Sequence, residues 1–182
     1  MTDKKLRLLV MTGLMAALVC VATIAIQVPM PLTNGYVNLG DCMILAAAWL
    51  LGPWSGFAAG AIGSALADLL TGYAHYAPAT FIIKGAMAVV FVLVMKVVSG
   101  KGRDELIGNI FGGIAAEILM VSGYFLYAWL LLGKNISGAA TSVPGNLLQG
   151  AFGVICGVLI IRILAKMKIK NKLKLTERKL HQ

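Results

Sequence analysis

Long apolar segments make up most of this chain, and short polar or proline-containing stretches separate them. A helix needs about 20 consecutive apolar residues to cross the hydrocarbon core of a bilayer. The hydrophobic pattern therefore predicts an all-α integral membrane protein with six transmembrane helices joined by short loops. The six predicted segments are 6–27, 39–51, 54–71, 79–98, 106–132 and 143–165.

The second segment is short for a full span. Either this helix is tilted, or the GYVNLGD stretch before it lies at membrane depth while buried in protein. Pro29 and Pro31 interrupt helix formation ahead of it, which predicts a loop over VPMPLTNGYVN. The Gly52-Pro53 pair predicts a tight turn before the third segment, and residues 101–104 form a second polar connector.

Composition agrees with a membrane protein, because 59% of the 182 residues are hydrophobic and 13% are charged. A soluble domain is typically about 45–50% apolar and about 25% charged. We expect one transmembrane domain over residues 1–182, with a basic tail at about 166–182. The three cysteines stand singly in apolar runs and predict no disulfide framework, and two histidines argue against a metal site.

Lysine and arginine gather on one side of the predicted topology. If the N-terminus is cytoplasmic, fourteen of these residues face the cytoplasm, Lys134 lies in an outer loop and Lys84 lies within a span. Cytoplasmic loops of membrane proteins carry the excess of basic residues. The bias therefore predicts that both the N-terminus and the C-terminus are cytoplasmic.

Polar residues inside the predicted spans are concentrated in the outer half. A charged side chain at a helix centre costs about 2.5–3.5 kcal/mol on insertion scales, so such residues tend to face protein or a wet cavity. Glu117 and Tyr124 share one helical face, as do Asn146 and Gln149. Together with Lys84 they predict a ligand pocket in the outer half for a small, polar, ring-containing solute.

Each of these residues also has a structural interpretation. Asp68 and Lys84 sit at similar depth on consecutive helices and are positioned to pair, while Asp41 beside Gly40 is positioned to cap the second helix. Glu117 is placed either to contact ligand or lysine, or to hydrogen-bond between helices. His75 is either a loop histidine or a ligand contact. Tyr124 and Tyr127 are either ligand platforms or interfacial anchors.

Small residues form two further helical faces. The third segment carries Gly56, Gly60 and Ser64 at four-residue spacing, which favours close packing inside the protein. The first segment carries a narrow small-residue face that is suited either to internal packing or to a partner protein. This face consists of Gly13, Ala16, Ala17 and Cys20.

Sequence signatures of enzymes are missing. The chain has no GxSxG, HExxH or GxxxxGK[ST] motif, so energy for uphill transport would have to come from another subunit. Two other classes of function are open: an autonomous channel or facilitator, and a membrane enzyme with Asp68 and Glu117 as its paired groups.

The block from GYVNLGD through LLGPWSG to GSALADLLTGYAHYAPATFIIKG resembles the substrate-binding S components of energy-coupling factor (ECF) vitamin transporters. The resemblance extends over essentially the whole chain and is strongest to the riboflavin, hydroxymethylpyrimidine and pyridoxine group. It implies a multi-pass protein of a prokaryotic cell membrane that captures a vitamin outside. It also implies partnership with a transmembrane T component and two cytoplasmic ATPases. ATP would be used by those partners, with no cofactor in this chain.

The resemblance also implies site residues. Docking to the partner would involve the first-segment face of Gly13, Ala16, Ala17 and Cys20. We favour pyridoxine or hydroxymethylpyrimidine as the substrate, with riboflavin as the alternative. The regions that line the pocket in this family supply the following residues here: Tyr36, Asn38, His75, Tyr76, Lys84, Glu117, Tyr124, Asn146 and Gln149.

Overall fold

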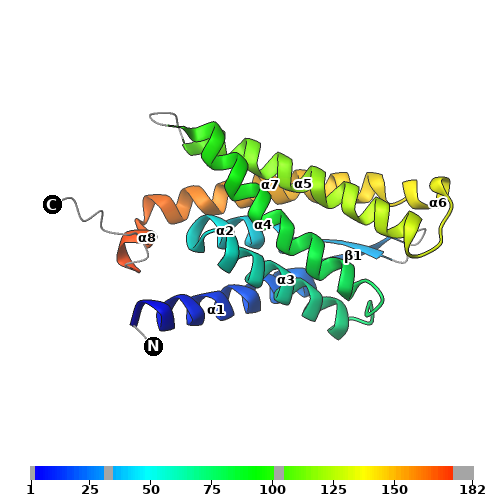
Figure 1. The fold of residues 1–182 in the computed structure, drawn as a ribbon, viewed down its shortest axis with the longest axis horizontal. Helices are drawn as coiled ribbons and strands as arrows, with labels where there is room; N and C mark the ends of the chain where they lie inside the picture. The colour runs from blue at the N-terminus through cyan, green and yellow to red at the C-terminus, as the bar shows by residue number, and fades with distance from the viewer. Residues whose placement is uncertain (1–2, 31–34, 101–104, 174–182) are drawn as a thin grey trace.

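The computed structural model describes residues 3–30, 35–100 and 105–173, and it is a mostly helical bundle (Figure 1). All six predicted segments form helices. The elements are, in order, α1 (Asp3–Ala25), β1 (Gln27–Met30), β2 (Gly35–Asn38), α2 (Gly40–Leu51), α3 (Pro53–Leu70), α4 (Ala77–Ser99), α5 (Glu105–Leu130), α6 (Ile136–Ala140), α7 (Val143–Lys166) and α8 (Ile169–Lys172).

Four helical stretches of the described chain are long and apolar enough to cross a membrane: Lys4–Ala25, Ala77–Ser99, Glu105–Leu130 and Ile136–Lys166. The helices α2 and α3 are not among them. At 1.5 Å per residue the 12 residues of α2 cover only about 18 Å. The prediction of six transmembrane helices is therefore confirmed only for these four stretches, and the second segment is short, as expected.

Helix α2 forms the centre of the bundle. Residues from Ile44 to Ala48 are at most 1% exposed, and α2 packs against α1, α3, α4 and α7. A helix enclosed on all sides by protein does not need to match the thickness of the bilayer. This burial supports the interpretation in which the short second segment and the polar residues before it are covered by neighbouring helices.

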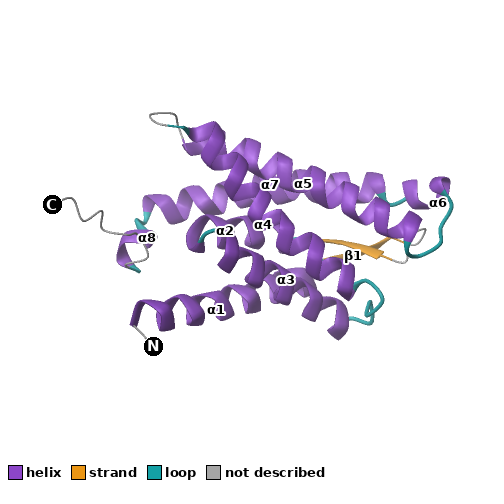
Figure 2. Cartoon of the chain, viewed as in Figure 1, coloured by secondary structure: helices purple, strands orange, loops and turns teal. Residues whose placement is uncertain are grey.

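A two-stranded hairpin replaces the loop predicted between the first two segments (Figure 2). Gln27 pairs with Asn38 and Pro29 pairs with Tyr36 in an antiparallel register. Proline is tolerated because both strands are edges of this small sheet. The all-α prediction is therefore wrong at this point, while residues 31–34 lie outside the described residues.

Other connections follow the sequence more closely. Gly52 has φ +87° and is followed by Pro53 at the first position of α3, which confirms the tight turn. The connector predicted at 101–104 lies outside the described residues, as does the tail from 174 onward. Before that point the basic tail forms the short helix α8.

The start of α1 and α8 lie at one end of the bundle, whereas the hairpin, α6 and the turn before α4 lie at the other (Figure 1). Arg7 Nη1 donates to the carbonyl oxygen of Leu173 at 3.1 Å. Lys170 Nζ sits 3.7 Å from the centre of the Trp49 ring at the end of α2, and burial lowers the pKa of this ammonium group.

Small residues on α3 let three helices approach closely. A Cβ added at Gly56 would lie 2.9 Å from Ala48 Cβ, and one added at Gly63 would lie 2.8 Å from Val19 Cβ. The internal packing predicted for this face is confirmed, because α3 presents it to both α2 and α1.

We predict that Gly63→Ala destabilises the protein by about 1–3 kcal/mol, because the new methyl group would overlap Val19 and the backbone of Ala16. Thermal unfolding in detergent micelles measures the effect as a lower midpoint. Gly13→Ala is the matched control, since nothing lies within 4 Å of a Cβ at that position. Equal midpoints for the two variants would contradict this account of the α1–α3 contact.

Candidate functional site

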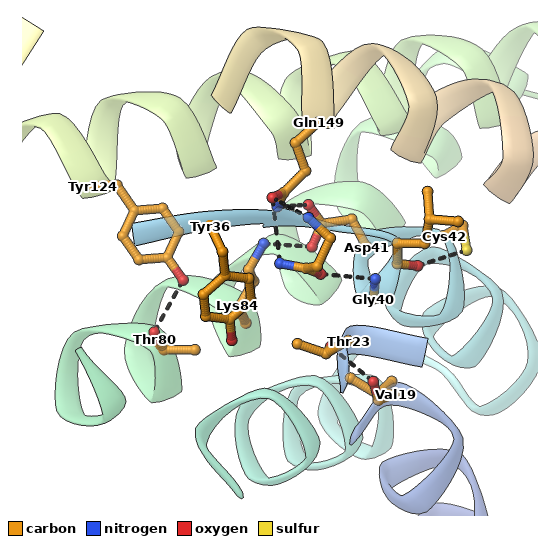
Figure 3. A network of polar contacts seen from close by, with 12 residues as sticks. Val19, Thr23, Tyr36, Gly40, Asp41, Cys42, Thr80, Lys84, Tyr124 and Gln149 are labelled. Carbon is orange, nitrogen blue, oxygen red and sulfur yellow. Dashed lines mark hydrogen bonds and ion pairs between the residues drawn. The ribbon is translucent and has the colours of Figure 1, made fainter. Parts of the chain in front are cut away.

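The centre of the site is a buried ion pair between α2 and α4 (Figure 3). Lys84 Nζ contacts Asp41 Oδ1, and the two residues are 2% and 0% exposed. The second oxygen of Asp41 accepts a hydrogen bond from Gln149 Nε2 of α7 at 2.6 Å. Three helices are thus joined through one carboxylate.

Asn38, at the end of β2, connects the hairpin to this cluster. Its backbone N–H and its side-chain Nδ2 donate to Gln149 Oε1 at 2.9 and 3.3 Å, and its Oδ1 accepts from the Gly40 N–H at 2.8 Å. Asn38 therefore supplies the side-chain acceptor at the start of α2. The capping role predicted for Asp41 is wrong, because both Asp41 oxygens bond to side chains on other helices.

Asp68 of α3 does not pair with Lys84, contrary to the sequence-based expectation. It accepts a hydrogen bond from the Tyr36 hydroxyl at 2.5 Å. Burial, with the nearby charge of Asp68, raises the pKa of Tyr36 well above its usual value, so the phenol remains protonated and a donor. Asp68 thereby fastens β2 to α3.

Aromatic side chains from three parts of the chain lie on the hairpin side of the ion pair. The ring centres of Tyr36 and Tyr73 are 4.7 Å apart, and those of Tyr76 and Tyr124 are 6.2 Å apart. Lys84 Nζ lies 5.6 Å from the centre of the Tyr124 ring, whose hydroxyl is 3.0 Å from Thr80 Oγ1. A polar group is therefore enclosed by flat apolar surfaces, which is typical of a site for an aromatic solute.

The turn before α4 is held by the same aromatic group. The Tyr127 hydroxyl donates to the carbonyl oxygen of His75, and the rings of His75 and Tyr76 are 4.6 Å apart. Tyr127 is thus anchored to the turn.

Lys84, Tyr124 and Gln149 border a cavity with about 610 Å³ of space between atoms, including the part open to the outside. The interior of this cavity is narrow, with a volume of about 50 Å³. The polar cavity is lined by Thr23, Tyr36, Asn38, Ser64, Asp68, Tyr76, Thr80, Lys84, Tyr124, Ala128, Lys134, Gly138, Ser142, Asn146 and Gln149.

The structure brings seven of the nine predicted binding residues together in this lining. His75 and Glu117 are not part of it. The sequence analysis missed Thr23, Ser64, Thr80 and Ser142 as lining residues, and it left open whether Asp68 contacts ligand or is structural. A signal for two of them was present, because Ser64 precedes Asp68 by four residues and Thr80 precedes Lys84 by four, which places each pair on one helix face.

Two buried atoms in the lining have no hydrogen-bond partner among the described residues: Ser64 Oγ and Asp68 Oδ2. Ser64 is 2% exposed and Asp68 is 4% exposed. Buried polar atoms in proteins are nearly always hydrogen-bonded. A hydroxyl and a carboxylate oxygen that remain available inside a cavity are therefore suited to a polar solute.

Glu117 of α5 is 5% exposed and lies against Gly150 and Gly153 of α7. Within the described residues neither of its carboxylate oxygens has a hydrogen-bond partner, so the predicted contact with Lys84 is not formed. Residues 3–30, 35–100 and 105–173 contain no group of three or more His, Cys, Asp or Glu residues that could hold a metal ion.

The small-residue face predicted on α1 is divided by the packing. Gly13 and Ala17 are exposed, and Cys20 is partly exposed. Ala16 is buried, with its backbone carbonyl facing Gly63 of α3. The outward part of this face therefore consists of Gly13, Ala17 and Cys20.

The fold and the enclosed polar cavity define a membrane-embedded solute-binding protein. The model of the family described as "ECF-type riboflavin transporter, S component" matches residues 3–166. The chain belongs to this family, which confirms the resemblance described above. It is a multi-pass membrane protein of a prokaryotic transporter family and a non-catalytic subunit in vitamin transport. The membrane-enzyme alternative is thereby excluded.

The chain is also similar to a solved structure and to a second protein. The structure reported as "Structure and mechanism of the S component of a bacterial ECF transporter" has the same fold, with a TM-score of 0.66 and 19% identity, covering 90% of this chain and 98% of that one. A Pyrococcus woesei protein described as "Uncharacterized protein in gap 3'region" is 39% identical over 139 residues, which is 76% of this chain and 88% of that protein. Of the two substrate expectations, the family description backs the riboflavin alternative better than pyridoxine or hydroxymethylpyrimidine.

We predict that Lys84→Met destabilises the protein by about 3–5 kcal/mol, because it leaves the Asp41 carboxylate buried without a cation. The double variant Asp41→Asn/Lys84→Met should recover much of this loss, since neither charge remains. Thermal unfolding of the wild type, the two single variants and the double variant provides the complete cycle. Additive losses in the double variant would show that the pair is not coupled.

Proposed function

We propose that this chain captures riboflavin in the polar cavity and delivers it across the membrane as the S component of an ECF transporter. The observation that carries the proposal is the pair of available acceptors, Ser64 Oγ and Asp68 Oδ2, inside the aromatic-lined cavity of a chain in the riboflavin family. The proposed orientation places the hairpin end of the bundle outside, as the distribution of lysine and arginine predicts.

The chemistry of the lining suits a flavin. The isoalloxazine ring is flat and aromatic and carries carbonyl oxygens and an imide N–H, while the ribityl chain carries hydroxyls. Tyr36, Tyr76 and Tyr124 offer surfaces for the ring, and Asp68 is an acceptor for an N–H or O–H group. Asn146 and Gln149 are amides that suit carbonyl or hydroxyl groups.

The narrow interior has a consequence for capture. A flavin is much larger than the interior volume of about 50 Å³, so the lining must widen as the ring enters. Tyr76 of the turn at residues 72–76 lines the cavity, and the turn is held by few backbone hydrogen bonds, among them Tyr73 N–H to Asp68 O and Tyr76 N–H to Tyr73 O. We propose that this turn moves during capture.

Release into the cytoplasm requires energy that this chain does not supply, because it has no nucleotide-binding motif. We propose that a transmembrane T component and two cytoplasmic ATPases provide it, with ATP bound by those subunits. The exposed part of the α1 face, Gly13, Ala17 and Cys20, is the proposed contact with the T component.

We predict that the purified chain quenches riboflavin fluorescence on binding and that Asp68→Asn raises the Kd at least about tenfold, or about 1.4 kcal/mol. The amide keeps the acceptor for Tyr36 but removes the carboxylate from the cavity. Glu105→Gln, an exposed acidic residue at the start of α5, is the control and should leave the Kd unchanged.

Competition experiments identify the substrate. Pyridoxine and hydroxymethylpyrimidine in large excess should not displace riboflavin. If either displaces it, or if riboflavin does not bind, the substrate assignment is wrong. Unchanged binding by Asp68→Asn would instead move the ligand away from α3 while keeping the substrate.

We predict that Ala17→Leu leaves riboflavin affinity unchanged but abolishes ATP-dependent uptake, because the larger side chain blocks close contact at the outward α1 face. Uptake into vesicles that hold the complete transporter is the measurement. Ala151→Leu, at an exposed position on α7, is the control. Normal uptake by Ala17→Leu would exclude this face, and rapid equilibration in vesicles holding this chain alone would favour an autonomous facilitator.

A further inference from the structure

Glu117 is a second carboxyl group close to the ion pair, yet it is not part of the polar cavity. A Cβ added at Gly153 would lie 2.5 Å from Glu117 Oε1 and 3.1 Å from Asp41 Cβ, so one glycine of α7 adjoins both acidic side chains. Glu117 is 5% exposed, and its two carboxylate oxygens have no hydrogen-bond partner within the described residues.

The charges around Glu117 do not balance if it is ionised. Asp41 of α2 and Lys84 of α4 are the charged groups that act on it, and α7 presents Gly150 and Gly153, which have no side chain. Lys84 already pairs with Asp41. A buried carboxylate without a cation or donor is so costly that a protonated acid is the favoured form.

Glu117 borders an apolar groove between α5 and α7. The other side chains that line this groove include Ile114, Ile118, Val121, Leu147 and Val154. Ile118 is 61% exposed and Leu147 is 56% exposed, so in a bilayer this surface faces the lipid chains. The Glu117 side chain therefore borders a lipid-facing surface, while its two oxygens are buried against Gly150 and Gly153 of α7.

We propose that Glu117 is a proton-bearing carboxylic acid beside the lipid-facing groove, and that it is modified by hydrophobic carbodiimides, such as dicyclohexylcarbodiimide, that enter this groove from the lipid phase. The acid proton moves to one carbodiimide nitrogen, and the carboxylate oxygen bonds to the central carbon. The acyl group then migrates from that oxygen to nitrogen and leaves a stable N-acylurea. The product contains every atom of both reactants, and nothing is oxidised or reduced. An ionised carboxylate brings no proton to the first step.

The test labels the full chain in lipid vesicles with dicyclohexylcarbodiimide and locates the adduct by peptide mass mapping. We expect one adduct, on Glu117, and less labelling at alkaline pH than at acidic pH, because ionisation removes the proton that the first step needs. A cationic, water-soluble carbodiimide should not label this residue. An adduct on Asp41 or Asp68 in place of Glu117, no adduct on Glu117, or labelling of Glu117 that is independent of pH would overturn the proposal.

Two variants test the charge argument. Asp41→Asn removes the partner of Lys84 and frees this cation for Glu117, so labelling at neutral pH should fall at least tenfold. Glu105→Gln is the matched control and should label normally, because Glu105 is exposed at the far end of α5. Unchanged labelling in Asp41→Asn, in protein whose thermal unfolding shows that it is folded, would overturn the link between the two carboxyl groups. Neither result depends on which vitamin the cavity binds.

Discussion

The buried pair of Asp41 and Lys84 is the contact on which the rest of the bundle depends. Two opposite charges can stay inside an apolar bundle only when they are close and their remaining hydrogen-bonding groups are satisfied. Gln149 meets this need on one side of Asp41, and the Tyr124 ring faces Lys84 on the other. The central helix, the helix that carries the cation and the last long helix are thereby held in one arrangement.

The same chain of contacts explains why the cavity forms at the hairpin end. Asn38 bonds to Gln149 and to the first turn of α2, and Tyr36 bonds to Asp68. The hairpin is therefore attached by polar side chains to α2, α3 and α7, although it has only two strands. Because these bonds lie at its C-terminal strand, polar groups and aromatic rings become walls of one enclosed space.

Much of the helical fold could be predicted from the sequence, because hydrophobic segments and proline–glycine breaks are local signals. The Gly52-Pro53 turn and the inward face of α3 are examples.

The hairpin could not be predicted, since its pairing joins residues whose sequence contains prolines and lacks the alternation of a strand. The partner of Lys84 could not be predicted from local sequence either. Asp41 at the start of α2 and Asp68 near the end of α3 lie at the same end of the bundle, and the choice between them depends on how the helices pack. Glu117 and Tyr124 share one face of α5 but lie about two turns apart along it, so Glu117 meets α7 and the α5–α7 groove whereas Tyr124 meets the cavity.

The link between α1 and the hairpin is short enough to transmit a movement of α1 to the hairpin. Only Ile26 separates the last residue of α1 from β1, and Leu39 alone separates β2 from α2. Thr23, near the end of α1, is 2% exposed and sits where a side chain at Gly40 would have to lie. A movement of α1 caused by a neighbouring protein would therefore be transmitted to the hairpin at the rim of the cavity. Binding of the solute and contact with that neighbour are coupled in this way.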